Sequence, residues 1–354
     1  MQATAKFLDQ CQKERPLLCL ATLIGSSAKA LLTRPGFSGK VLAVLSTTIY
    51  LVSRDGEILW LSQNGLAMHR RCVLASFQPR SICVGQNFLV DDPFLQFFGG
   101  VTIDLDPATE WKPSLIGPKD AEPLVVVNAC TRRLVEAVTK IGDAKGFGQM
   151  IPLISSLADG NKQPISIADP LLAVARNSIL NLATACSKFD MTEVTQRGRE
   201  LIGLGPGLTP SGDDFLGGLL FAAHSLKTAY PQDFNWGEKP VDALIDWAST
   251  QTHPISHTIL RDHASGHGPE PLHELVVSLL KGQDPDRTLE GVKRLIGMGD
   301  TSGWDILAGM LTGMLFVEGK LNTALPHFSF LRKDGRELRM EETIDTCRRH
   351  QTED

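Results

Sequence analysis

The sequence predicts an α+β protein in which an antiparallel, β-rich domain precedes a mostly helical one. Between Val41 and about Asp106, short β-branched and apolar runs alternate with turn residues, as strands and hairpins require. From Val125 onwards, apolar residues recur at steps of three and four, the period of an amphipathic helix. A chain of 354 residues also exceeds the usual size of one domain. We therefore expect a β-rich domain at residues 1–120 and a helical domain at 121–354.

The expected strands of the first domain are separated by turn residues. Arg54-Asp55-Gly56 is a hairpin turn between two apolar runs. After the last strand, four prolines alternate with charged residues over 107–123, which favours an extended linker. The expected strands are residues 41–52, 57–61, 82–84 and 101–105.

The second domain shows helical periodicity almost throughout. Asp190, followed three residues later by Glu193, is a capping signal for a helix that starts at Met191. The expected helices are residues 125–141, 170–186, 191–201, 212–226, 241–250, 272–280, 287–296 and 303–317.

Composition excludes several classes of protein. The net charge is −5 and no basic run occurs, which argues against a nucleic-acid partner. The seven cysteines are scattered and never form a Cys-x-x-Cys pair, so we expect a reducing cytoplasm and no thiolate zinc site. The apolar stretch 17–32 is interrupted by Gly25 and Lys29 and is too short to span a bilayer, so we expect no membrane segment.

Two segments, 201–220 and 295–311, repeat one pattern: an apolar stop, a Gly-rich loop, Ser-Gly-x-Asp and an apolar helix. Such a loop leaves backbone N–H groups unblocked at a helix N-terminus, where the amides and the helix dipole favour an anion. We expect the helices that begin near Gly212 and Gly303 to pack side by side and to bring both loops to one cleft. The small residues that would allow this approach are Gly217, Gly218, Gly309 and Gly313.

A purely structural interpretation of the repeat stays open. Ser211 with Asp214, and Ser302 with Asp305, have the spacing of a capping box, which would only stabilise a helix start. The first loop, however, interleaves glycines with prolines over 203–210, which is more than a cap needs.

The two copies differ at one acidic position. Asp213 has no counterpart in the second copy, where Trp304 stands. We expect Asp214 and Asp305 to serve the fold, and Asp213 to be the extra acid that could bind a ligand amine or hold Mg²⁺ against a phosphate. The alternative is an exposed carboxylate that complements the helix dipole.

Five of the nine histidines fall between His253 and His273. Two pairs are spaced four apart, as a metal site on one helix face would require, but Pro254 and later glycines interrupt any single helix. No Cys or Glu completes a familiar zinc pattern, so we expect no metal site there.

The same segment contains Ser256, which we take as a candidate catalytic hydroxyl lining a polar pocket with Thr252. A triad of Ser256, His257 and Asp262 is disfavoured, because adjacent side chains on one element point in different directions. The segment also lacks the Gly-x-Ser-x-Gly motif that forms the nucleophile elbow of many serine hydrolases.

The sequence Gly-Leu-Gly-Pro-Gly-Leu-Thr-Pro-Ser-Gly-Asp-Asp-Phe-Leu at 203–216, followed by Thr-Ser-Gly-x-Asp-x-Leu-x-Gly at 301–309, resembles a known family. It is the poorly characterised family that contains the AllH-type subunit of oxamate carbamoyltransferase, often labelled carboxylase-like. The resemblance extends through most of the chain, including 255–266 and Trp111-Lys112-Pro113. Just before the second Thr-Ser-Gly the family often has His, whereas this sequence has Asp300.

The resemblance implies carbamoyl transfer between oxalurate and phosphate, giving oxamate and carbamoyl phosphate, in anaerobic allantoin breakdown with partner subunits. Small anions of this kind suit loop amides at helix N-termini. Asp213 or Asp214 would then orient the carbamoyl amine or a metal-bound water, Mg²⁺ being the cofactor considered. The expected anion-binding residues are Gly205, Gly207, Thr209, Ser211 and Gly212 in the first copy, and Thr301, Ser302, Gly303 and Asp305 in the second.

Two other functions stay open. An ATP- and Mg²⁺-dependent ligase or kinase would also use a Gly-rich loop followed by acids, but the loop has no lysine and no Gly-x-x-x-x-Gly-Lys pattern. A non-catalytic partner subunit that binds a metabolite is the other alternative.

Overall fold

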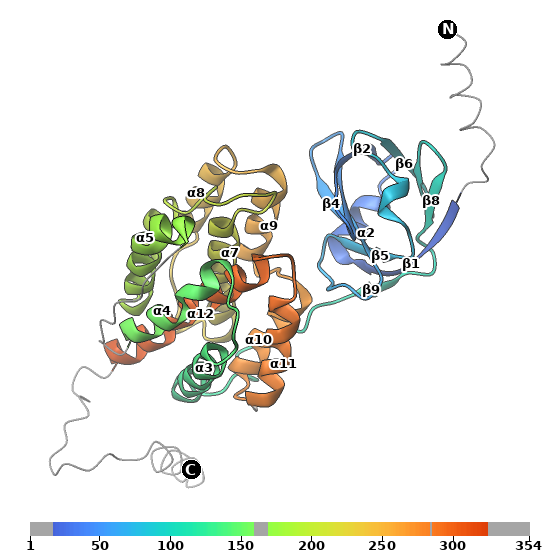
Figure 1. The fold of residues 1–354 in the computed structure, drawn as a ribbon. Helices are drawn as coiled ribbons and strands as arrows, with labels where there is room; N and C mark the ends of the chain where they lie inside the picture. The colour runs from blue at the N-terminus through green and yellow to red at the C-terminus, as the bar shows by residue number, and fades with distance from the viewer. Residues whose placement is uncertain (1–16, 159–168, 284, 325–354) are drawn as a thin grey trace, which may run out of the picture.

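The computed structural model describes residues 17–158, 169–283 and 285–324 (Figure 1). All strands in this part of the chain lie between Leu17 and Trp111, and the helical body begins at Leu124. The expected order, a β-rich region followed by helices, is confirmed. The outer parts of the two expected domains, 1–16 and 325–354, lie outside the described residues, as do Cys11 and Cys347.

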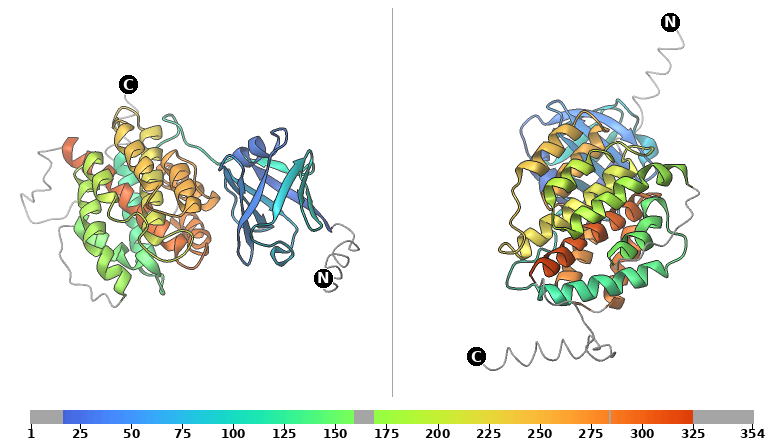
Figure 2. Two further views of the ribbon diagram at one scale, coloured as in Figure 1. Left: turned by 90° about the horizontal axis from the view of Figure 1, so that it is seen from above. Right: turned by 90° about the vertical axis from the view of Figure 1, so that its left-hand side faces the viewer.

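Eight strands of the first domain close into a barrel. The left-hand view of Figure 2 shows this domain beside the helices. Their order around it is β5-β4-β3-β2-β6-β7-β8-β1, and β1 pairs with β5 to close the circle. Most neighbours are antiparallel, but β1–β8 and β4–β5 are parallel. The bounds are β1 (Leu17–Gly25), β2 (Ser38–Val44), β3 (Thr48–Ser53), β4 (Ile58–Gln63), β5 (Cys72–Ala75), β6 (Asn87–Asp91), β7 (Phe94–Phe97) and β8 (Val101–Asp104).

Two further elements complete this domain. Helix α2 (Ser26–Leu32) packs Ala28, Leu31 and Leu32 into the apolar barrel core. Strand β9 (Thr109–Trp111) pairs in parallel with β1 and lies inside the expected linker. The proline-rich segment is therefore extended, as expected, but part of it belongs to the sheet.

The strands differ from expectation at two places. The apolar run 41–52 is two strands, because the chain turns at Leu45, whose N–H donates to the carbonyl of Thr48 at 2.8 Å. Residues 82–84 are not a strand. They follow a 3₁₀ turn that starts at Pro79, and Gly85 after them has a φ of 82°. Turn geometry at both ends of so short a run leaves no length for pairing.

The helical domain surrounds two central helices, α7 and α12 (Figure 1). Helix α9 was not expected, because Pro254 seemed to interrupt it. Instead, Pro254 is its first residue, where the missing N–H costs nothing. Asp190 caps α6 as expected, accepting from the N–H of Glu193 at 2.9 Å. The bounds are α3 (Leu124–Thr139), η2 (Gly146–Met150), α4 (Ile151–Ala158), α5 (Pro170–Ser187), α6 (Met191–Gly198), α7 (Ser211–Ala229), α8 (Lys239–Ala248), α9 (Pro254–Ala264), α10 (Glu270–Leu280), α11 (Pro285–Ile296) and α12 (Ser302–Ala324).

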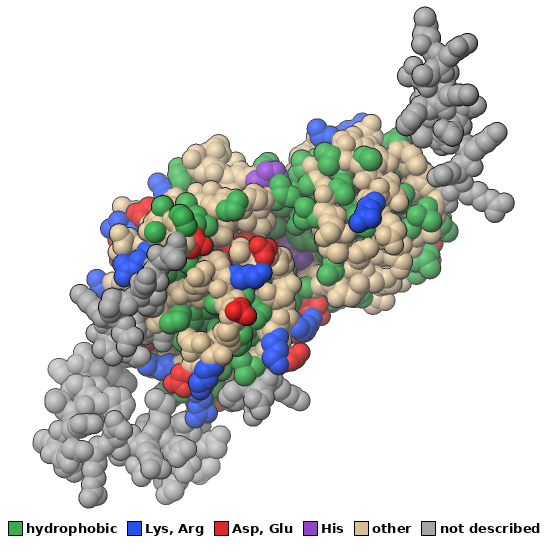
Figure 3. All heavy atoms as spheres, viewed as in Figure 1, with side chains coloured by type: hydrophobic (Ala, Val, Ile, Leu, Met, Phe, Trp, Pro, Cys, Tyr) green, Lys and Arg blue, Asp and Glu red, His purple; other side chains and the backbone are tan. Residues whose placement is uncertain are grey.

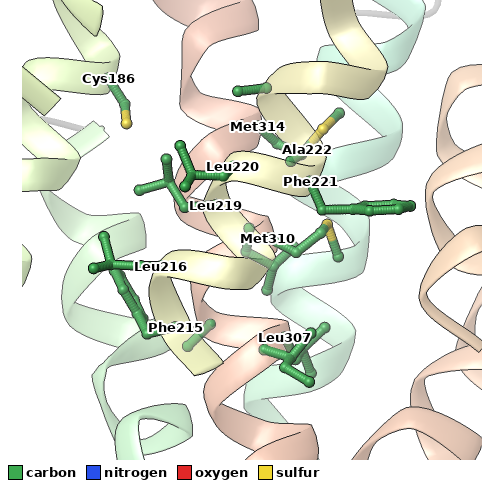
Figure 4. Close-up of a cluster of buried hydrophobic side chains, with 14 of the residues drawn as sticks. Cys186, Phe215, Leu216, Leu219, Leu220, Phe221, Ala222, Leu307, Met310 and Met314 are labelled. Atoms are coloured by element: carbon green, nitrogen blue, oxygen red, sulfur yellow. The ribbon is translucent and has the colours of Figure 1, made fainter. Parts of the chain in front are cut away.

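Helices α7 and α12 meet at backbone contact. A Cβ atom on Gly218 would lie 2.0 Å from the carbonyl oxygen of Ile306, and one on Gly309 would lie 1.8 Å from that of Phe215. Gly313 also faces α7, whereas Gly217 faces His263 of α9. The helices therefore pack side by side as expected, but Gly217 serves another neighbour. Side chains around this contact belong to one buried cluster (Figure 4).

A buried ion pair joins the barrel to the helices. The guanidinium of Arg71 binds Asp262 of α9 through two hydrogen bonds, Nε–Oδ2 at 2.6 Å and Nη2–Oδ1 at 3.2 Å. Beside it, the N–H of Glu270 donates to the carbonyl of Met68 at 2.8 Å. Histidine side chains also gather where the domains meet (Figure 3). Within the described ranges, no helix is long and apolar enough to cross a membrane.

Candidate functional site

The first Gly-rich loop follows a path that depends on glycine. Gly203, Gly205 and Gly207 have φ angles of 74°, 122° and 97°, in the region that disfavours side chains. A Cβ atom on Gly205 would lie 2.8 Å from the backbone nitrogen of Ser211, whereas Gly207 faces open space. The loop therefore turns tightly onto the helix start and exposes its tip.

The second loop closes onto its helix with the same hydrogen bond as the first, at the aligned positions. The N–H of Gly212 donates to the carbonyl of Leu204 at 2.9 Å, and the N–H of Gly303 donates to that of Met298 at 3.0 Å. These amides are engaged within the chain. The expectation that Gly212 and Gly303 offer their N–H groups to an anion is therefore wrong, because each loop uses that donor to close onto its own helix.

The two loops come together at the beginnings of α7 and α12. The hydroxyl oxygens of Thr209 and Ser302 lie 3.2 Å apart, and both side chains are half-buried. The helices run in the same direction, so both N-termini are at this end. This is the shared location that the aligned segments predict.

The serines do not cap their helices as expected. Pro210 occupies the N-cap position of α7 with a ψ of 142°, and no side chain caps this end. Ser211 and Ser302 are the first residues of α7 and α12. Because no side chain caps α7, the capping-box interpretation is wrong for Ser211 and Asp214.

Asp214 receives the hydroxyls of Ser302 and Thr209, and is only 4% exposed. Its Oδ2 atom has no hydrogen-bond partner among the described residues. Burial raises the pKa of this carboxyl well above its usual value, and the charges of Asp305 and Asp213 raise it further. The neutral form is therefore favoured here.

Asp305 makes the corresponding contacts from the other helix. It accepts from the N–H of Phe147 at 2.6 Å and from the hydroxyls of Thr301 and Ser211. Burial raises its pKa to about 6, against the opposing effect of these hydrogen bonds. Asp214 and Asp305 thus each hold the serine that begins the opposite helix.

Asp213 has a different set of partners. It is 2% exposed and accepts from the N–H of Gly203 at 2.7 Å, from the hydroxyl of Ser256 at 2.6 Å and from the hydroxyl of Thr252. Our expectation that Asp213 has no structural duty is wrong, and so is the alternative of an exposed carboxylate. The reason is that α9 and its preceding turn fold over the loop. A catalytic role for Asp213 stays a prediction.

The residues of the disfavoured triad bind elsewhere. Ser256 donates to Asp213, His257 places Nε2 at 3.1 Å from a backbone carbonyl of α8, and Asp262 binds Arg71. Ser256 and Thr252 do line one polar cluster, as expected. Their hydroxyls are directed at a carboxylate, so this cluster fixes the loop.

The histidines between His253 and His273 act separately. His253 caps α9, and His273 accepts from a backbone N–H at 3.2 Å. His263 is 1% exposed, its ring nitrogens have no partner in the described part of the chain, and burial lowers its pKa to about 3. Within the same ranges, no group of three His, Cys, Asp or Glu residues could hold a metal ion.

Two residues near the candidate site were not expected from the sequence. Phe147 of η2 supplies the amide that binds Asp305, and a Cβ atom on its neighbour Gly148 would lie 2.6 Å from the ring of Trp304. The glycines that flank Phe147 were a signal of such a close approach. Tyr50 of β3 is the other contributor: burial raises its pKa, and the nearby Asp214 charge adds to the effect.

Residues 201–314 match the model of a family described as oxamate carbamoyltransferase subunit AllH. The resemblance to the AllH-like family is thereby confirmed. The matched segment contains both loops, the starts of α7 and α12, and the Asp213 cluster. No solved structure shows a significant match to the chain.

Proposed function

We propose that this AllH-like chain is a carbamoyltransferase subunit that holds a small anion between its two Gly-rich loops. The meeting of two helix N-termini at Thr209 and Ser302 carries the proposal. Each N-terminus bears a partial positive charge, so two of them at one place favour a phosphate or carboxylate without any lysine or arginine. The family match over the same residues supports the reaction class.

The reaction we propose is transfer of a carbamoyl group from oxalurate to phosphate. A phosphate oxygen attacks the carbamoyl carbon, a C–O bond forms, the C–N bond breaks, and the oxamate nitrogen takes up a proton. Negative charge develops on the carbamoyl oxygen during the attack. Donors fixed beforehand stabilise such charge most effectively, and a loop held by glycine geometry meets this requirement.

In this proposal the site residues have separate tasks. The loop tip at Gly205 and Gly207 and the hydroxyls of Thr209 and Ser302 bind the anion. Asp213 is a positioning residue, because it ties Gly203 to α9 through Ser256. Partner subunits supply the remaining groups of the active site, in the cytoplasm.

Calorimetric titration tests the anion site. Phosphate, carbamoyl phosphate and oxamate are titrated into wild type and Gly207→Val, which forces a side chain into a φ of 97° in open space. Gly85→Val is the matched control, with a φ of 82° and equally open surroundings in the barrel. We expect Gly207→Val to weaken binding about tenfold or more, a loss of ~1.4 kcal/mol, and Gly85→Val to leave it unchanged.

Three outcomes would contradict the proposal. Absence of binding by all three anions removes the site, and equal binding by both variants places it away from the first loop. Binding of ATP with Mg²⁺ alone favours a ligase or kinase. Activity is then measured from oxamate and carbamoyl phosphate with the chain alone and with its partner subunits, and we expect oxalurate only from the mixture.

A further inference from the structure

The proposed anion site contains buried acids but no base. The segments 201–212 and 297–303 carry no lysine or arginine, and the lysine that reaches the second loop, Lys145, forms a surface ion pair with Asp300. The titratable groups that face Asp214 are Asp213 on its own helix, Asp305 of α12 and Tyr50 of β3. From α9, His257 lies near Asp213, and η2 has no titratable side chain. An ionised Asp214 in these surroundings would repel an anion held between the loops.

The contacts of Asp214 indicate how the site avoids this repulsion. Thr209 and Ser302 are the half-buried hydroxyls between the loops, their oxygens lie 3.2 Å apart, and both are close enough to Asp214 to lower the pKa of its carboxyl. A hydroxyl has one proton. If both hydroxyls donate to an ionised carboxylate, they present only lone pairs to a ligand. If the carboxyl carries a proton, it donates to a hydroxyl, whose own proton is then available to the ligand.

The second carboxyl oxygen makes the protonated form reasonable. Asp214 Oδ2 is buried and has no partner among the described residues. An ionised oxygen in such a place loses its hydration without replacement, whereas a carboxylic acid loses far less. Asp305 also has a buried Oδ2 without a partner among the described residues, but the N–H of Phe147 donates to its Oδ1 at 2.6 Å and favours its ionised form.

We infer that the anion-binding form of this site is the one with Asp214 protonated, so that a hydroxyl of the Thr209–Ser302 pair acts as a donor to the ligand. The inference rests on the proposed function and deepens it. When the pH is above the pKa of Asp214 in the free protein, one proton moves from solvent to the carboxylate as the anion binds, and no other bond changes. Asp214 is thus a positioning residue that sets the direction of two hydroxyl groups.

Oxamate binding as a function of pH tests the inference, because its carboxylate stays ionised above about pH 6. For the wild-type full chain, we expect oxamate affinity to fall about tenfold per pH unit once the pH exceeds the raised pKa of Asp214 in the free protein. Above that pKa, titrations in two buffers of different ionisation enthalpy should show uptake of one proton per oxamate.

Two variants separate the roles of the aspartates. Asp214→Asn has a permanent N–H donor in place of the acidic proton, so its oxamate affinity should be independent of pH, without proton uptake. Asp305→Asn, the matched control, should keep the wild-type pH dependence. A wild-type affinity that stays flat over the whole pH range in which the protein remains folded, or an unchanged slope in Asp214→Asn, would overturn the inference.

The hydroxyl variants provide a second test that leaves Asp214 in place. Thr209→Val should bind oxamate at least about tenfold more weakly at low pH, the effect of one lost hydrogen bond to a charged group, and Thr209→Ser should restore it. Equal binding by Thr209→Val and wild type would also overturn the inference. If oxamate binds to neither wild type nor Asp214→Asn at any pH, the anion site itself fails; binding without proton linkage refutes the Asp214 role alone.

Discussion

Replacement of Asp213 by alanine would remove a carboxylate that three donors share. The N–H of Gly203 and the hydroxyls of Thr252 and Ser256 all bind it, and the side chain is 2% exposed. A buried donor left without a partner costs about 1–3 kcal/mol. Because the three donors are adjacent and partly satisfy one another after the change, we expect a total loss of about 3–5 kcal/mol. Asp213→Asn keeps the shape and one acceptor, and should cost about 1–2 kcal/mol.

The assay is urea unfolding followed by far-ultraviolet circular dichroism, which reports mainly on the helical domain. The control is Asp300→Ala, which removes an exposed acid that forms a surface ion pair with Lys145 at 2.7 Å and should cost less than about 1 kcal/mol. A loss below about 1 kcal/mol for Asp213→Ala would refute the reasoning, because it would leave the buried hydroxyl of Ser256 without its acceptor and also remove the part-buried bonds to Gly203 and Thr252.

Three further changes test separate parts of the structure. Gly212→Ala places a Cβ atom 1.9 Å from a backbone carbonyl, so it should lower the free energy of unfolding by about 3 kcal/mol or more, whereas Gly142→Ala, in open space, should not. Asp262→Ala leaves the buried Arg71 charge without Asp262 between the domains and should lower the free energy of unfolding by about 3–5 kcal/mol in the urea experiment. A decrease of less than about 1 kcal/mol would contradict a stabilising buried ion pair at this place. Asp305 has a pKa raised from 3.8 to about 6, so the folded state binds more protons in this window and stability falls as the pH rises through it. Asp305→Asn should therefore stabilise the protein by about 1–3 kcal/mol at pH 7.5 and have little effect near pH 4. An equal change in the free energy of unfolding at the two pH values would contradict the raised pKa of Asp305.

The sequence predicts the helical domain well and the barrel poorly. Helices such as α5 and α7 are long enough for their apolar period to be read directly. The strands β5 (Cys72–Ala75), β7 and β9 have four or three residues, too few for a period of two to be distinct. Strand β1 lies in an apolar run in which Gly25 and Lys29 suggested interruption. The barrel closure depends on pairing between β1 and β5, which nothing local in the sequence indicates.

The site shows the same division between local and distant information. The two Gly-rich loops have similar sequences, and this similarity alone predicts that the starts of α7 and α12 lie together. The task of Asp213 depends on Thr252 and Ser256, some forty residues away along the chain. Which of two adjacent acids turns toward the opposite helix and which toward α9 is decided by tertiary packing, and a capping pattern cannot separate them.

The central claim is that the two Gly-rich loops form one anion site. The most direct test is an amide NMR titration of glycine-labelled protein with oxamate, following Gly205, Gly207 and Gly299 together. We predict that the resonances of both loops shift along one binding curve with a single dissociation constant, while Gly85 in the barrel does not move. Shifts confined to one loop, or two curves with different constants, would contradict the claim.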